Sequence, residues 1–251
     1  MENQNGYISV HHLRKKYTRK KQEDLLVFDD ISFNINKGEF LCIVGESGCG
    51  KSTLLRLISG LDTEYEGQII INHKSVKSPD KSRGFVYQES RLFPWMTVEK
   101  NVGFVINDGN KDEKRKKIKE ILEIVGLKGF ETAYPKELSG GMAQRVNIAR
   151  ALVNKPDVLF FDEPFGALDA LTRMQLQKEL LMIHRKHMAT TLLVTHDIEE
   201  AIYLANKIIV LKYRPAKIMD FIEIKLPYIR DRGNEDFQAI RKSIYKYFQD
   251  N

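Results

Sequence analysis

Cysteine and long apolar runs are both scarce in this chain of 251 residues. Its only two cysteines, Cys42 and Cys49, argue against a disulfide framework and predict reduced thiols in a cytosolic protein. No apolar run approaches the roughly 20 residues that a bilayer-spanning helix needs, so any spanning segments are expected in other chains. The polar N-terminus also lacks the apolar segment of a secretory signal.

The chain is without internal repeats, low-complexity blocks or a large excess of one charge. Its net charge of +6 suits anionic partners such as nucleotide phosphates or lipid headgroups, but is too small to indicate nucleic acid by itself. Two basic clusters, residues 14–21 and 111–119, are predicted to be solvated loop or helix faces. The apolar content of 42% is that of an ordinary globular protein. The length of 251 residues is enough for one large α/β domain with a buried core.

Apolar periodicity predicts a strand-rich beginning and then an alternation of strands and helices. The early strands are expected at residues 7–10, 31–35, 40–44 and 68–71, with a helix at 52–59 that stops at Gly60. Residues 118–125 and 142–153 have helical spacing, and a last amphipathic helix closes the chain. Apolar runs at 158–161, 191–194 and 208–211 alternate with helices, which favours a mainly parallel sheet.

A phosphate-binding loop is indicated by residues 45–52, which read Gly-Glu-Ser-Gly-Cys-Gly-Lys-Ser. Glycines let backbone N–H groups curl around the α- and β-phosphates, while Lys51 reaches the β- and γ-phosphates and the Ser52 hydroxyl ligates Mg²⁺. The alternative is a chance glycine turn. The buried strand before the loop and the helix after it supply the context that the motif requires, so we reject that alternative.

Two adjacent carboxylates, Asp162 and Glu163, follow the apolar run at residues 158–161. The carboxyl end of a buried strand is where α/β proteins bind ligands. In an enzyme with a phosphate loop, Asp162 would hold Mg²⁺, and Glu163 would act as general base or orient the attacking water. A surface Asp-Glu turn is the alternative, which the four bulky apolar residues before the pair make less plausible.

A second glycine-rich segment, Leu-Ser-Gly-Gly-Met-Ala-Gln-Arg, occupies residues 138–145. Ser139 is a good N-cap residue, and Gly140 and Gly141 would expose amide N–H groups at the positive end of a helix. The segment therefore predicts an anion site. The glycines alone would equally suit a plain helix start, and the whole octet carries the prediction.

These motifs, together with Thr195-His196-Asp197, resemble in order and spacing the ATP-binding subunit of ABC transporters. The resemblance extends from Tyr17 to about Arg232. It implies an α/β fold: a P-loop NTPase core with a mainly parallel sheet, an N-terminal antiparallel β lobe and an inserted helical lobe. We expect a single domain over residues 1–251, with subregions at 1–87, 88–155 and 156–251.

The resemblance also implies a site for ATP and Mg²⁺. Glu163, His196 and Gln88 would be catalytic, and Ser52, Gln88 and Asp162 would hold the metal. The implied ATP-binding residues are Tyr17, Gly45, Glu46, Ser47, Gly48, Cys49, Gly50, Lys51, Ser52, Thr53, Ser139, Gly140 and Gly141. Tyr17 would stack on the adenine, with a solvent-exposed tyrosine beside its basic neighbours as the alternative. Ala167-Leu168-Asp169 resembles the loop that crosses the dimer interface in that family.

In that family two copies close on two ATP molecules, and Ser139 would bind the γ-phosphate held by the opposite copy. The implied partners are integral-membrane permease subunits and, indirectly, a solute-binding protein, with no nucleic acid. The implied location is peripheral, at the cytoplasmic face of the cell (inner) membrane. Many relatives carry an extra regulatory domain, for which we expect no room here.

The segment at residues 92–95, Leu-Phe-Pro-Trp, is apolar where exposure is expected, which suggests a protein contact. Packing within the helical lobe is the alternative. The Pro-Trp pair of this segment, residues 165–173 and Leu226-Pro227 near Arg230-Asp231-Arg232 together resemble the nitrate, sulfonate and taurine importer branch. Relatives that import thiamine precursors or other small organic solutes stay open. A soluble ABC ATPase would predict a coiled-coil insertion or a duplicated cassette. The presence of Glu163 and His196 argues against a non-transport module that binds ATP without hydrolysing it. The Pro-Trp pair argues against an exporter subunit.

Overall fold

The computed structural model describes residues 6–18, 23–166 and 168–249. The chain divides into two compact units: residues 1–80 with 190–251 form the first, and residues 81–189 form the second. Among the described residues, no helix is both long enough and apolar enough to cross a membrane.

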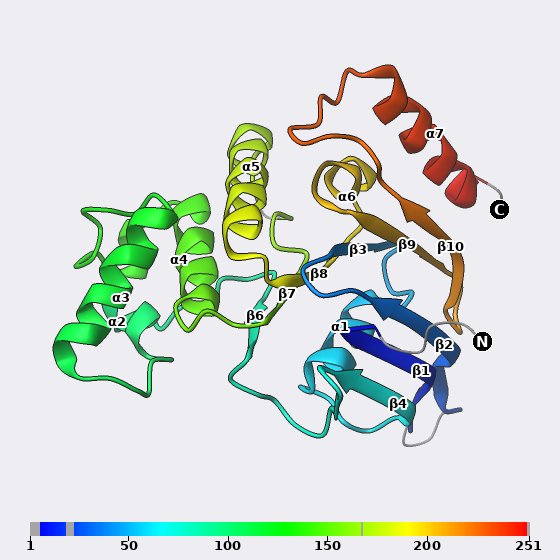
Figure 1. Ribbon diagram of the computed structural model, residues 1–251, viewed down its shortest axis with the longest axis horizontal. Coiled ribbons are helices and arrows are strands. Elements are labelled where there is room, and N and C mark those ends of the chain that lie inside the picture. Colours follow the sequence, from blue (N-terminus) through cyan, green and yellow to red (C-terminus); the bar gives the residue numbers. More distant parts are fainter. Residues whose placement is uncertain (1–5, 19–22, 167, 250–251) are drawn as a thin grey trace. The chain divides into compact units, whose positions relative to one another are not determined.

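The first unit contains a four-stranded antiparallel sheet in the order β2-β1-β4-β5, seen as the dark blue to cyan arrows of Figure 1. Its strands are β1 (Ile8–Tyr17), β2 (Leu25–Ile35), β4 (Glu66–Ile71) and β5 (Lys74–Ser75). Ile31, Phe33 and Ile35 alternate with exposed neighbours and are buried, as the alternating sequence pattern predicts. The strand expected at residues 7–10 continues to Tyr17, and its pairing with β2 shifts register three times between Val10 and Lys16.

The same unit contains a mainly parallel group of strands. These are β3 (Phe40–Gly45), β8 (Thr190–Thr195), β9 (Lys207–Lys212) and β10 (Lys217–Glu223). β3 lies between β8 and β9 and is parallel to both, while β10 pairs antiparallel with β9. All residues of β3 and β8 are buried, which is why they read as continuous apolar runs in the sequence.

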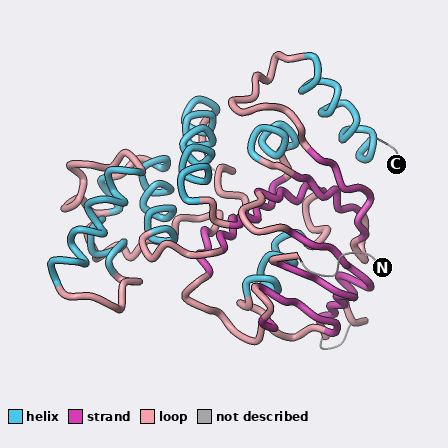
Figure 2. The backbone as a smooth tube through the Cα atoms, viewed as in Figure 1, coloured by secondary structure: helices cyan, strands magenta, loops and turns pink. Residues whose placement is uncertain are grey.

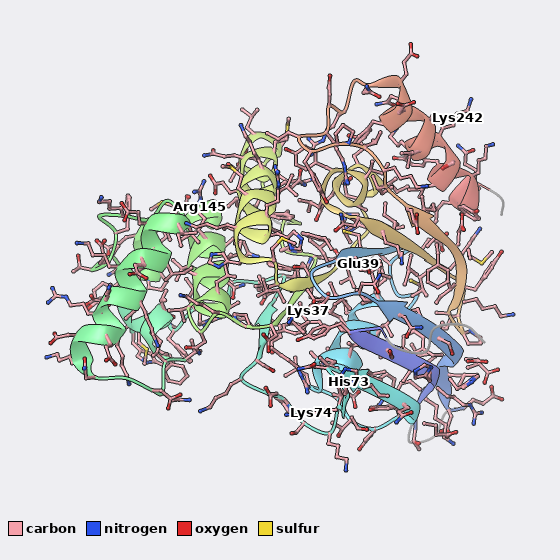
Figure 3. All side chains as sticks on the ribbon, in the orientation of Figure 1. Lys37, Glu39, His73, Lys74, Arg145 and Lys242 are labelled. Atoms are coloured by element: carbon pink, nitrogen blue, oxygen red, sulfur yellow. The ribbon has the colours of Figure 1, made fainter. Side chains whose placement is uncertain are left out.

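Three helices complete the first unit: α1 (Lys51–Ser59), α6 (Ile198–Leu204) and α7 (Glu235–Gln249). α1 ends at Gly60, whose left-handed conformation (φ 82°) matches the predicted stop. α7 is amphipathic, as predicted. Phe237 and Ile244 are buried two turns apart, and Lys242 lies on its exposed side (Figure 3).

The second unit is largely helical, and helices are drawn in cyan in Figure 2. The strands β6 (Arg83–Val86) and β7 (Val158–Asp162) pair in parallel. The helices are α2 (Val98–Gly103), α3 (Lys111–Ile124), α4 (Gly140–Leu152) and α5 (Ala170–His187), with a short 3-10 turn, η1, at Pro135–Glu137. α3 begins with a capping box between Asn110 and Glu113 and carries the solvated basic cluster 111–119 on its exposed face, as predicted.

The buried histidine of α5 makes stability sensitive to acid. Burial lowers the pKa of His184 to about 4, below its ordinary value near 6.5. Between about pH 6.5 and 4, His184 is therefore protonated in the unfolded chain but neutral in the folded chain. The free energy of unfolding falls as the pH drops through this range.

We expect the free energy of unfolding to fall by up to about 3 kcal/mol through this group between about pH 7 and pH 4. His184→Gln removes the titrating ring, so its unfolding free energy should depend less steeply on pH. Urea unfolding of both proteins at several pH values measures the difference. Equal slopes would show that His184 is not a source of the acid sensitivity.

Candidate functional site

The phosphate loop follows β3 and leads into α1. The Lys51 side chain is 4% exposed, and its ammonium donates hydrogen bonds to the carbonyl oxygens of Gly45 at 2.8 Å and Glu46 at 2.9 Å. Ser47, Gly48 and Ser52 are exposed. The loop thus holds a positive charge beneath an open rim of backbone, at the N-terminal end of a helix, which is a favourable arrangement for an anion.

Two glycines of this loop are required by local geometry. A Cβ on Gly45 would lie 2.4 Å from the carbonyl oxygen of Leu211, so the strand packing leaves no room for a side chain there. Gly50 has φ 115°, and a Cβ on it would meet Val27 and Phe28 at 2.8 and 2.9 Å. The glycine spacing that marks the motif in the sequence therefore has a direct steric cause.

Cys49 lies inside this loop and is buried. Burial raises the pKa of its thiol, and the nearby Lys51 ammonium only partly offsets that effect. Burial also raises the pKa of Cys42 in β3. Both cysteines are free thiols, as predicted, and both are held in the protonated, poorly nucleophilic form.

Tyr17 at the end of β1 is tied to a buried lysine. Lys15 is 1% exposed, forms an ion pair with Asp62 at 3.0 Å and donates to the carbonyl oxygen of Glu64 at 2.6 Å. Its ammonium also lies 4.5 Å from the centre of the Tyr17 ring, and the Tyr17 hydroxyl bonds to Asp62.

The expectation that the whole basic cluster 14–21 is solvated is therefore wrong for Lys15. The cause is Asp62, which lies 47 residues away along the chain and compensates the buried charge. Burial by itself would raise the pKa of Asp62. The hydrogen bonds from the Glu64 backbone and from Lys15 together lower this pKa by more than burial raises it, so it lies below its ordinary value. Lys20 and Lys21 lie outside the described residues.

His196 follows β8 and is exposed. Because β3 pairs in parallel with β8 and β9, their carboxyl ends meet at one edge. Val44 is opposite Thr195, and Gly45 is opposite Leu211. A pocket of about 230 Å³ next to this edge is lined by Gly45, Glu46 and His196 together with apolar side chains. The structure therefore brings the phosphate loop and His196 together within the first unit.

In the second unit, β7 ends at Asp162 and Glu163 follows directly, and both residues are half-buried. Glu163 has a left-handed backbone (φ 44°), a conformation that a residue other than glycine adopts at a cost of about 1 kcal/mol or more. The Gln88 amide lies beside the turn that follows, since a Cβ on Gly166 would be 3.4 Å from its nitrogen. Gln88, Asp162 and Glu163 are thus gathered around one strand end.

Ser139 caps α4, and its hydroxyl accepts a hydrogen bond from the Met142 amide at 3.2 Å, as predicted. Ser139 and Gly140 are exposed at this helix start. Leu168 and Asp169 lie just before α5, where Asp169 is the N-cap, while Ala167 lies outside the described residues. Ser139 and Asp169 are therefore both N-cap residues at helix starts.

Side chains of α4 hold the chain on both sides of Gln88. Gln144 and Asn147 are buried and donate to the carbonyl oxygen of Tyr87, at 3.4 and 3.2 Å. Arg150 donates to the carbonyl oxygens of Ser90 and Arg91, each at 3.0 Å. Arg145 of α4, labelled in Figure 3, forms an ion pair with Glu179 of α5 at 2.8 Å. Gln144 and Arg145 belong to the octet at residues 138–145, but no sequence motif marks Asn147 or Arg150, whose acceptors are backbone carbonyls.

The apolar segment at residues 92–95 projects one large ring into solvent. Trp95 is 70% exposed, and its ring lies 5.6 Å from that of Phe93. Asn101 of α2 is fully buried and fixes the segment, accepting from the Phe93 amide and donating to the carbonyl oxygens of Phe93, Met96 and Thr97. Trp95 is therefore an exposed side chain on a well-fixed backbone.

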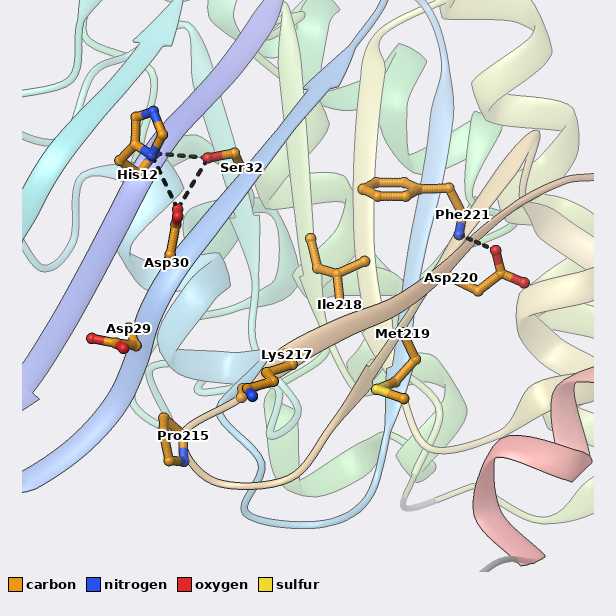
Figure 4. Close-up of a pocket in the computed structure, with 11 residues that line it drawn as sticks. His12, Asp29, Asp30, Ser32, Pro215, Lys217, Ile218, Met219, Asp220 and Phe221 are labelled. Carbon is orange, nitrogen blue, oxygen red and sulfur yellow. Dashed lines mark hydrogen bonds and ion pairs between the residues drawn. The ribbon is translucent and has the colours of Figure 1, made fainter.

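A larger hollow of about 900 Å³ lies between β2 and β10 in the first unit (Figure 4). Its walls include His12, Asp30, Ser32 and Phe221, and His12 is held by Asp30 and Ser32. None of the predicted nucleotide-binding residues lines it. Volume alone therefore does not identify the functional site in this chain.

Comparison with known proteins places the chain in a family. A family model described as "ABC transporter" matches residues 28–166. The aliphatic sulfonates import ATP-binding protein SsuB of Bacillus subtilis is 54% identical over 224 residues, which cover 89% of this chain and 87% of that protein. The protein of the same name from Bacillus cereus is 51% identical over 234 residues, covering 93% of each chain.

A solved structure described as a dimeric post-hydrolysis state of an ATP-binding cassette, bound to ADP and Pi, is similar with a TM-score of 0.76 and 31% identity. That similarity covers 88% of this chain and 100% of the other. The resemblance inferred from the motifs and the α/β fold it implied are both confirmed. The chain belongs to the ABC transporter family.

Proposed function

We propose that this chain is the ATP-hydrolysing subunit of an ABC importer that takes up an aliphatic sulfonate or a related small organic anion. The observation that carries the enzymatic part is the phosphate loop, with a buried Lys51 ammonium under an open rim of backbone at the start of α1. The solute class follows from relatives named for aliphatic sulfonate import, since the solute itself does not touch such a subunit. Nitrate, taurine and thiamine precursors are the competing solutes.

The phosphates of ATP would bind over the loop formed by residues 45–53. Lys51 now donates to two loop carbonyls, and an incoming β- or γ-phosphate oxygen is a stronger acceptor for the same ammonium. The exposed Ser47, Gly48 and Ser52 line the same rim. Tyr17 offers an aromatic surface for the adenine. The Lys15 ammonium lies over its ring, and Tyr17 is nevertheless 37% exposed.

The donors proposed for Mg²⁺ fit that ion in their chemistry. The Ser52 hydroxyl, the Asp162 carboxylate and the Gln88 amide are all oxygen donors, which Mg²⁺ prefers. Within the described part of the chain, no group of three or more His, Cys, Asp or Glu side chains could hold a metal alone, so phosphates and water would supply the other ligands. Bound with ATP, the ion supplies neutralisation of charge on the β- and γ-phosphates.

Hydrolysis needs an ordered water and a place for its proton. Glu163 would accept the proton as the water oxygen bonds to the γ-phosphorus and the bond to the bridging oxygen breaks. The strained backbone of Glu163 and the adjacent Gln88 support this assignment, because strain concentrates where a side chain must be aimed. His196 would donate a hydrogen bond to a γ-phosphate oxygen.

Two copies would close head to tail on two ATP molecules, so that the α4 start of one copy, with Ser139, Gly140 and Gly141, binds the γ-phosphate held by the other. The exposed Ser139 at a helix N-terminus supports this. A similar cassette is known as a dimer. Closure would drive separate permease subunits at the cytoplasmic face of the membrane, with a solute-binding protein as an indirect partner.

The catalytic assignment predicts a clear effect of Glu163→Gln. ATP binding should persist, while the steady-state rate of phosphate release should fall by about two orders of magnitude, because the general base is lost. The variant should also accumulate as an ATP-dependent dimer in gel filtration. The matched control is Glu120→Gln, an exposed carboxylate of α3, which should turn over normally. Normal turnover by Glu163→Gln would refute the assignment.

The adenine assignment is tested by comparing two substitutions of Tyr17. Tyr17→Ala should weaken ATP binding about tenfold, since stacking of one base is worth on the order of 1–3 kcal/mol. Tyr17→Phe keeps the ring and loses only the hydroxyl bond to Asp62, so its affinity should stay within about twofold. Titration with a fluorescent ATP analogue gives both values. If the two variants bind alike, Tyr17 is simply a surface tyrosine.

The partner assignment is tested at Trp95. Trp95→Ala should spare folding and the ATPase activity of the isolated subunit, yet weaken assembly with the permease by about 2 kcal/mol or more. Uptake of an aliphatic sulfonate into vesicles containing the whole transporter should be lost. Met182→Ala, which removes another exposed apolar side chain of the same unit, is the control. Uptake of nitrate, taurine or a thiamine precursor instead would correct the solute, and full sulfonate uptake by Trp95→Ala would reject the docking role.

A further inference from the structure

We infer that the C-terminal helix α7 positions His196 and that Arg241 is the positioning residue through which it does so. The inference rests on the proposed role of His196 in ATP hydrolysis and deepens it. None of the sequence motifs includes α7, which lies more than thirty residues after His196 in the chain.

His196 is fixed by the helix that follows it. The Thr195 hydroxyl accepts from the Asp197 amide at 3.0 Å and donates to the Glu200 carboxylate at 3.3 Å. Asp197 caps α6 by accepting from the Glu200 amide at 3.1 Å. The residues on both sides of His196 are therefore bonded into the first turn of α6, and a shift of α6 moves the histidine backbone.

The first turn of α6 is held by α7. Arg241 of α7 forms an ion pair with Glu199, which lies three residues after His196. Both side chains are about one-third exposed, at 37% and 36%, so the pair is partly shielded from water. α7 itself is anchored by the buried Phe237 and Ile244 and by a hydrogen bond of 2.8 Å from the Tyr247 hydroxyl to Asp220 of β10.

The other end of α6 is held by the segment that leads into α7. Arg230 is 4% exposed, and its guanidinium donates to the carbonyl oxygens of Ile202 and Ala205, each at 2.6 Å. The Tyr228 hydroxyl donates to the Leu204 carbonyl oxygen at 3.3 Å. These bonds satisfy the free carbonyls at the end of α6. The C-terminal segment thus bonds to both ends of α6, through Arg241 at its start and Arg230 at its end.

α7 also contributes directly to the surroundings of His196. Tyr245 and Phe248 line the pocket of about 230 Å³ that His196, Ile198, Gly45 and Glu46 share. The wall of the pocket that contains the start of the phosphate loop is therefore built in part by α7. If the ion pair is broken, α6 and this wall lose one fixed point, and the His196 ring loses a defined position. ATP binding, which depends on the phosphate loop, should change little.

The experiment reverses the charges of the pair one at a time and together. Arg241→Glu and Glu199→Arg should each lower kcat for ATP roughly tenfold, with KM within about twofold, since misplacing a reacting group lowers the rate rather than the affinity. The double variant restores opposite charges and should return kcat to within about threefold of the wild type. Arg241→Lys should stay close to the wild type.

Controls separate this role from general stability and from the proposed function. Glu123→Lys breaks an exposed pair with Lys128 and should leave kcat and KM unchanged. His196→Ala is measured in parallel, and loss of turnover there supports the proposed function. If it loses turnover while Arg241→Glu does not, the inference is wrong and the proposed function stands. Single reversals that lower kcat without rescue in the double variant would also overturn the inference. Normal turnover by His196→Ala would reject the proposed role of the histidine itself.

Discussion

The parallel pairing of β3 with β8 and β9 is the constraint on which the first unit depends. Because the register aligns Val44 with Thr195 and Gly45 with Leu211, the loops after these strands begin at one edge. The phosphate loop and His196 are consequently neighbours, although about 150 residues separate them in the sequence. The full burial of β3 and β8 makes this register costly to change, since a slip of one residue would exchange the side chains on their two packed faces and disrupt the close packing on both.

The sequence predicted those parts of the molecule in which local pattern and chemistry agree. The apolar runs became β3, β7, β8 and β9, and the glycines of the phosphate loop stand where φ or close packing requires them. Ser139 is the N-cap that its residue type suggested. In each case the signal lies within about ten residues of sequence, so no knowledge of distant partners was needed.

The parts that could not be predicted are interactions between distant residues of ordinary type. Lys15 is buried only because Asp62 and the Glu64 carbonyl receive its charge. Asn101, Gln144 and Asn147 hold the segment around Gln88 and Trp95 by bonding to backbone carbonyls, which every residue possesses. A single sequence shows neither the pairing of distant positions nor the choice of a backbone acceptor. Lys15, Asn101 and Asn147 therefore looked like any other polar side chains, and Gln144 stood out only as part of the octet at residues 138–145.

These unpredicted contacts share a physical purpose that the apolar core cannot serve. Apolar packing is non-directional, so it buries a side chain without fixing its orientation precisely. A buried amide or guanidinium bonds at defined distances and angles, so it fixes the positions of the atoms to which it bonds. Asn101 fixes the backbone beneath an exposed Trp95, and Arg230 fixes the end of the helix that follows His196. Each buried polar group would be destabilising if its partner moved away. The segments for which we propose a contact with ATP or with a partner are therefore held by directional bonds, and the strands beneath them are held by the apolar core.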